Sequence, residues 1–186
     1  PTDAGDVTAV VARTGYTGED GFELFCANTD AQAVWDAVIG SGTPCGLAAR
    51  DSLRLEAGMN LYGQDMDESR HPLESGLGWT IAWAPESRQF VGREALTAVR
   101  GTDHPRFVGL VLEGRGVLRA HMKLRFANGA LGEITSGGFA PSMKASIALA
   151  RVDAHHDGAC EVEIRGQWAP VRLVKPPFVR HGQVRV

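Results

Sequence analysis

From residue 106 onward the chain is a series of short runs of strand-forming residues. The runs are Arg106–Leu112, Lys123–Phe126, Gly132–Thr135, Ala145–Arg151, Cys160–Ile164 and Gln167–Val174. Gly, Asn, Asp and Pro separate these runs, and Asn128-Gly129 and Arg165-Gly166 are typical of tight hairpin turns. Evenly spaced short strands of this kind predict a small antiparallel barrel or sandwich.

The first hundred residues show a different pattern, in which a hairpin precedes short helices. Residues 6–26 alternate like a β-hairpin, and apolar residues in 31–38 recur with helical spacing. Thr29 and Gln32 match a capping box at the start of this helix, and Gly40 ends it. The apolar spacing makes Trp35 a predicted core residue.

Two more helices are predicted, from Leu47 to Ala57 and from Gly92 to Val99. The residues between them are rich in turns, apart from an apolar strand predicted over residues 77–83. Its Trp79 and Trp83 are expected in the core or at an interface. Thr102–Pro105 is linker-like, so we divide the chain into residues 1–102 and 103–186. The predicted fold class is α+β.

Composition and charge limit the classes of partner. The net charge of −3 and the scattered Lys and Arg residues argue against nucleic acid and anionic lipid. No apolar stretch approaches the roughly 18 to 20 residues of a membrane span. The three cysteines lack C-x-x-C spacing, which argues against a disulfide framework or zinc site and favours a reducing compartment. Cys26 closes a predicted strand and is expected to be buried.

His155-His156 is the one pair that resembles metal ligands. Asp153 and Asp157 flank it and Gly158 follows, a pattern typical of a polar turn. We therefore predict no metal site.

The glycine loop, residues 13–23, joins the strands of the predicted hairpin. Gly15, Gly18 and Gly21 either let the backbone approach a ligand at positive φ or only make the turn. Tyr16 offers an aromatic face, and Glu23 places a carboxylate where the second strand begins. This pair suits a planar, polar heterocycle with adjacent N–H donors.

Arg50 and Arg54 stand four residues apart on the second predicted helix, where like charges repel. Asp51 and Glu56 on the same helix, or an anionic ligand, would offset this repulsion. The alternative interpretation is a solvated charged face.

Several motifs occur together in a fixed order. They are Arg13–Glu23 (RTGYTGEDGFE), Gly46–Gly58 (GLAARDSLRLEAG) with Leu61–Met66 (LYGQDM), Pro72–Trp79 (PLESGLGW), Phe90–Leu96 (FVGREAL), and Gly132–Pro141 (GEITSGGFAP) with Ile147–Val152 (IALARV). In this order they closely resemble the glycine cleavage system T-protein, a tetrahydrofolate-dependent aminomethyltransferase. The resemblance extends over essentially the whole chain.

The resemblance implies a three-domain cloverleaf fold around a central folate site, with this chain forming the C-terminal part. It also implies transfer of a methylene carbon from the aminomethyl-dihydrolipoyl group of H-protein to tetrahydrofolate, with release of ammonia. The expected compartment is the cytoplasm of a bacterium or the mitochondrial matrix.

By the same resemblance, Glu23 binds the pterin, Tyr16 lies along the folate and Arg50 contacts it. Arg180, after the pair Pro177-Phe178, matches a C-terminal arginine that reaches the ligand. The chemistry agrees, because a carboxylate accepts two parallel pterin donors and guanidinium groups suit the acceptors of the glutamyl tail.

T-proteins are about twice as long, so the resemblance implies that this chain, which begins at Pro1, is the second half. The family's aspartate near folate N5 then lies in the absent half, and no catalytic residue is assigned here. We expect the first hundred residues to expose apolar surface that the missing N-terminal half covers.

Two other interpretations remain open. One is the folate-binding half of a dimethylglycine or sarcosine dehydrogenase-like protein, and the other is a non-transferase folate-binding protein that supports iron–sulfur assembly. LYGQDM and GLAARDSLRLEAG favour the T-protein, and nothing here resembles the cysteine motif of the last group.

Overall fold

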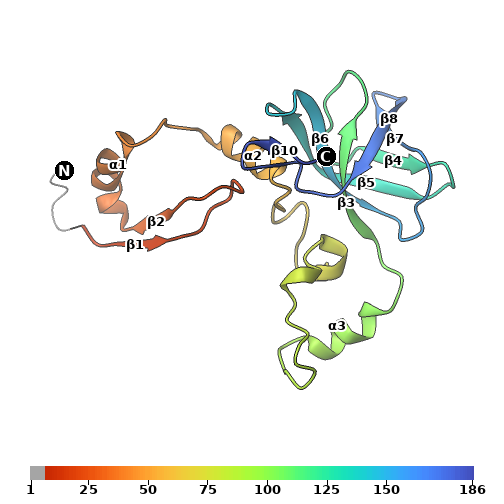
Figure 1. Cartoon of the computed structure of the whole chain (residues 1–186), viewed down its shortest axis with the longest axis horizontal. Helices are drawn as coiled ribbons and strands as arrows, with labels where there is room; N and C mark the ends of the chain where they lie inside the picture. Colours follow the sequence, from red (N-terminus) through yellow and green to blue (C-terminus); the bar gives the residue numbers. More distant parts are fainter. Residues whose placement is uncertain (1–6) are drawn as a thin grey trace.

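The computed structural model describes residues 7–186 as a barrel with two smaller projecting lobes (Figure 1). One lobe holds the antiparallel strands β1 (Ala9–Ala12) and β2 (Glu23–Cys26) with helix α1 (Ala31–Ile39). The other holds helix α3 (Arg93–Arg100). Residue 6, where the hairpin was predicted to begin, lies outside the described residues.

Six antiparallel strands close into the barrel, which confirms the fold predicted from the short runs. They are β3 (Arg106–Leu112), β4 (Lys123–Phe126), β5 (Leu131–Ala140), β6 (Ala145–Val152), β7 (Cys160–Ile164) and β8 (Gln167–Val174), in the order β3-β6-β5-β4-β7-β8. Apolar side chains from all six strands, among them Leu110, Leu124 and Val162, fill the main core.

Strand β5 is longer than the predicted Gly132–Thr135. Its register with β6 shifts between Ile134 and Ser136, at a β-bulge. After the bulge, a Cβ at Gly137 would lie 2.7 Å from the backbone of Leu118, so only glycine lets the two chain segments approach. Gly137 and Gly138, which follow the predicted run, are therefore part of the strand.

Helix α2 (Leu47–Glu56) packs on the outside of the barrel against β5 and β6. Its Leu55 belongs to a second buried cluster with Ile147, Leu149 and Phe178. A short hairpin of β9 (Val179–Arg180) and β10 (Gln183–Val184) follows Phe178, whose N–H donates to the carbonyl of Glu56 at 2.9 Å. The C-terminal segment of the chain thus returns to the end of α2.

Two predictions of local secondary structure were wrong. Residues 77–83 form no strand, because Gly78–Thr80 is a 3-10 helix that follows another at Pro72–Ser75, and no strand among the described residues pairs with it. Thr29 and Gln32 form no capping box: Asn28–Asp30 is already a 3-10 turn, and Asp30 occupies the N-cap of α1. The chain turns before the helix begins, so the predicted cap position lies outside it.

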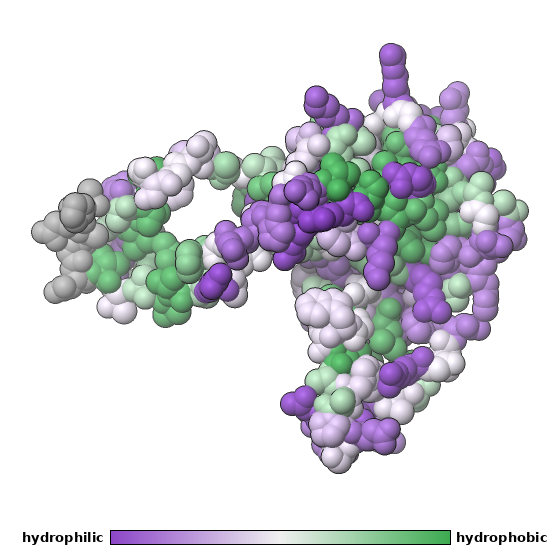
Figure 2. Space-filling model, viewed as in Figure 1, coloured by the Kyte–Doolittle hydropathy of each residue, from purple (hydrophilic) through white to green (hydrophobic). Residues whose placement is uncertain are grey.

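Large apolar side chains are exposed along the first hundred residues. They include Val10, Val11, Phe22, Phe25, Leu47, Tyr62 and Val91. Trp35 is 50% exposed and Trp79 is 84% exposed, so neither lies in the core of the described residues. Cys26, which was expected to be buried, is only half-buried. Figure 2 shows apolar surface on the lobe of α1 and an opening between this lobe and the barrel. Within residues 7–186, no helix combines the length and apolar character needed to cross a membrane.

Candidate functional site

The glycine loop reaches from the hairpin to the C-terminal end of α2 (Figure 1). Gly18 is buried there with φ +77°, and a Cβ on it would lie 2.5 Å from the Cβ of Ala57. Glycine is therefore required at this contact. Gly15 and Gly21 have no positive φ and no atom within 4 Å of an added Cβ. Of the three glycines, Gly18 alone combines positive φ with a close backbone approach, and this approach is to Ala57; approach to a ligand stays a prediction.

Tyr16 and Arg50 form a stacked pair beside this contact. The guanidinium carbon of Arg50 lies 4.5 Å from the centroid of the Tyr16 ring, a cation–π geometry. The Tyr16 hydroxyl donates to the carbonyl oxygen of Asn60. Partial burial raises the pKa of Tyr16, although Arg54 and Arg50 oppose this shift, so the phenol remains a neutral donor at physiological pH.

Arg54 differs from Arg50 in burial: it lies in the contact between α2 and the barrel, where its Nη1 donates to the hydroxyl of Ser136, and it is 3% exposed. Its Nε lies 2.8 Å from an oxygen of Asp51, and its Nη1 lies 3.1 Å from Asp65. The interpretation of this helix as a solvated charged face is therefore wrong for Arg54. Asp51 offsets the repulsion as expected, whereas Glu56 accepts hydrogen bonds from the backbone and hydroxyl of Ser142.

Asp65 is the buried centre of this region, and the pattern analysis did not single it out. Its carboxylate accepts the backbone N–H of Leu61 at 2.8 Å, Nη1 of Arg54, and the hydroxyls of Thr135 and Ser136 on β5. A fully buried carboxylate with this many donors is well compensated. Asp65 therefore fixes both α2 and the following loop on the barrel.

The other two predicted site residues lie on exposed parts of the hairpins. Glu23 is the first residue of β2, and the hydroxyl of Thr14 donates to its Oε2. Arg180, on β9, has its Nη1 3.8 Å from the position that a Cβ on Gly18 would occupy. Arg180 thus reaches the glycine loop that carries Tyr16, on which Arg50 of α2 stacks. Glu23 lies where that loop ends.

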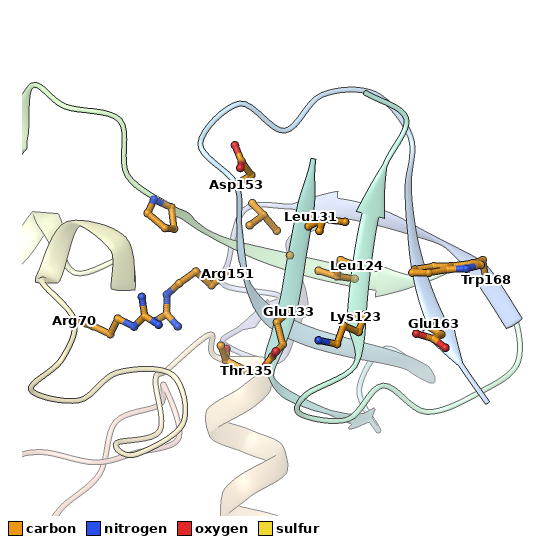
Figure 3. Close-up of a pocket in the computed structure, with 13 residues that line it drawn as sticks. Arg70, Lys123, Leu124, Leu131, Glu133, Thr135, Arg151, Asp153, Glu163 and Trp168 are labelled. Carbon is orange, nitrogen blue, oxygen red and sulfur yellow. The ribbon is translucent and has the colours of Figure 1, made fainter. Parts of the chain in front are cut away.

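A broad groove of about 590 Å³ lies elsewhere, between the barrel and the segment that carries Arg70 (Figure 3). A row of charged residues crosses its strands, with Glu133 paired in register to Lys123 on one side and Arg151 on the other. Burial and the neighbouring Arg70 lower the pKa of Arg151. The alternating charges balance one another, and no predicted folate residue lines the groove.

The two adjacent histidines serve structural contacts. His155 pairs with Asp103 at 3.1 Å, and Nδ1 of His156 lies 2.7 Å from the carbonyl of Asp153. Within residues 7–186, no group of three or more His, Cys, Asp or Glu residues is placed to hold a metal ion.

Two family models match this chain. The model of the GCVT N-terminal domain matches residues 1–85, and the model of the glycine cleavage T-protein C-terminal barrel domain matches residues 106–180. The chain belongs to the glycine cleavage T-protein family. The second match covers the barrel that the structure shows.

Similar proteins agree with this family. Over 95% of this chain, the sequence is 55% identical to the aminomethyltransferase of Nitrosococcus oceani. It is also 55% identical, over 95% of this chain, to the aminomethyltransferase of Pseudomonas syringae pv. tomato. It superposes on the glycine cleavage system aminomethyltransferase T from Bartonella henselae with a TM-score of 0.81 at 34% identity, over 94% of this chain. The chain spans about half of each protein: 48%, 49% and 51% respectively.

Proposed function

We propose that this chain is the C-terminal half of a tetrahydrofolate-dependent aminomethyltransferase of the glycine cleavage system. The complete enzyme would transfer a methylene carbon from aminomethyl-dihydrolipoyl H-protein to tetrahydrofolate and release ammonia. The observation that carries this proposal is the stacked pair of Tyr16 and Arg50 beside the Gly18 contact. The relatives named aminomethyltransferase support it, and they give no support to the dehydrogenase-like or non-transferase alternatives.

The residues present fit a folate. The exposed carboxylate of Glu23 has one oxygen engaged by Thr14, and no described residue donates to the other, so it is open to the adjacent donors of a pterin. Arg50 is exposed and turns one face to Tyr16, which leaves its N–H edge for acceptors of the ligand. Arg180 adds a second guanidinium for an anionic tail. Folate, when bound, supplies the nitrogen that receives the carbon.

In this proposal the chain binds and orients folate but holds no catalytic group of its own. A polypeptide that corresponds to the remaining half of the relatives would supply that group and close the cavity. H-protein would be the second partner. The bacterial relatives favour the cytoplasm as the compartment.

The test is titration calorimetry with tetrahydrofolate. We expect weak binding to the 186-residue chain and tight binding once a polypeptide covering the remaining half is added, because enclosure and preorganisation then contribute. Only the mixture, supplied with aminomethylated H-protein, should release ammonia. Full turnover by the chain alone would contradict the proposal.

Glu23→Gln tests the pterin contact in the same mixture. Loss of one charge-assisted pair should weaken tetrahydrofolate binding by about 1.5–3 kcal/mol. Glu86→Gln, an equivalent change on an exposed turn, is the matched control and should leave the affinity unchanged. Equal affinities for the two variants would remove Glu23 from the site.

A further inference from the structure

The glycine loop and the C-terminal hairpin contact each other at two consecutive positions. Gly18 faces the guanidinium of Arg180, and the next residue, Glu19, binds His181. One oxygen of Glu19 accepts the backbone N–H of His181 at 2.8 Å, and the other lies 3.1 Å from Nδ1 of the same residue. These residues are 162 positions apart in the chain.

The hairpin that Glu19 holds is short and tightly turned. His181 and Gly182 have φ of 51° and 67°, as in a two-residue turn with both central residues at positive φ. Arg180 pairs with Gln183 directly before and after this turn. Fixing His181 therefore also fixes the backbone from which the Arg180 side chain extends.

Arg180 needs such support because it is exposed, and ordering a long side chain on a two-residue strand is entropically costly. We propose that Glu19 is a positioning residue, which latches the C-terminal hairpin to the glycine loop and thereby holds Arg180 toward the folate site. This inference rests on the proposed function. Glu19 itself does not contact the ligand in this proposal.

Hydrogen exchange tests the latch without any ligand. Glu19→Ala should speed exchange of the His181 amide by about tenfold or more, because the amide loses its acceptor. Glu19→Gln keeps a side-chain oxygen as acceptor and should restore most of the protection. Asp20→Asn is the control, since Asp20 is the neighbouring carboxylate and its one ion pair within residues 7–186 is with Arg13, at 3.6 Å. Unchanged exchange in Glu19→Ala would overturn the latch.

Tetrahydrofolate titration of the chain, mixed with the complementary polypeptide, tests positioning. Glu19→Ala should weaken binding by about tenfold or more, the effect of losing one hydrogen bond to a charged group, and Glu19→Gln by less. In an Arg180→Ala background, Glu19→Ala should have no further effect. Fast exchange with unchanged affinity, or additive losses in the double variant, would overturn the positioning role. If the unsubstituted mixture binds no folate, the proposed function fails, while the exchange result still decides the latch.

Discussion

At the scale of residues, the two arginines of α2 belong to one sequence pattern but differ in burial and therefore in what they contact. Arg54 is buried against two carboxylates and holds the helix on the barrel. Arg50, one turn earlier, stays exposed and stacks on Tyr16. Their repulsion is small because the charge of Arg54 is neutralised by Asp51 and Asp65, and the exposed charge of Arg50 is the one that we propose for the folate.

Arg50→Lys should separate a ligand role from a surface role. An ammonium cannot reproduce a planar guanidinium that stacks on one face and donates from its edge, so we expect tetrahydrofolate affinity to fall about tenfold. The melting temperature should stay the same, because Arg50 is exposed. Calorimetry and thermal melting of the same sample provide the comparison. Unchanged affinity would assign Arg50 to a solvated helix face.

Cys160 gives a pH-dependent prediction. Burial raises the pKa of its thiol from 9.0 to about 12, so the folded chain keeps the proton that the unfolded chain loses near pH 9. The stability gained from the neutral thiol is therefore present below pH 9 and is lost as the pH rises toward 12. Chemical denaturation between pH 8 and 11 should show a steeper decline for the unsubstituted chain than for Cys160→Ala. Parallel declines would contradict the prediction.

At the scale of elements, α2 belongs physically to the barrel although it precedes the predicted boundary at residue 102. Leu55 enters a barrel cluster, and Glu56 accepts hydrogen bonds from Ser142 at the β5–β6 turn. The end of α2 also meets Gly18 and the segment before β9. The candidate site is therefore built on a helix whose position the barrel determines.

Asp65→Asn tests this attachment. The substitution leaves Arg54 buried without its full counter-charge and gives Thr135 and Ser136 a poorer acceptor. Removing one partner of a buried ion pair typically costs about 3–5 kcal/mol, and we expect the free energy of unfolding in urea to fall by this amount. Asp20→Asn, the same change at a carboxylate with a 91% exposed side chain, should leave it unchanged.

At the scale of the whole molecule, the barrel is closed on itself whereas the lobe of β1, β2 and α1 is not covered. Helix α1 has no buried residue, and the apolar side chains around it face outward. Exposed apolar surface of this extent is typical of a surface that contacts another polypeptide. It is consistent with a chain that spans about half of its relatives.

Segments of the chain should differ in stability accordingly. Residues 103–186 are expected to fold alone, with a cooperative melt and a β-type circular dichroism spectrum, because the strands close their own core. Residues 46–186 should melt at a higher temperature, because α2 adds Leu55 to the outer cluster. A non-cooperative trace for the shorter segment, or equal melting temperatures for both, would contradict this prediction.

The sequence by itself determined the parts of this protein that depend on neighbouring residues. Turn residues between evenly spaced strands predicted the barrel, and helical spacing with flanking glycines predicted α2 to within one residue of its end. Tyr16, Glu23, Arg50 and Arg180 came from motif resemblance, and their roles remain predictions. The tertiary structure alone decided which way Arg54 points, the burial of Asp65 and the contact of Glu19 with His181. Each of these depends on partners at no fixed spacing along the chain, because folding and not local periodicity brings them together.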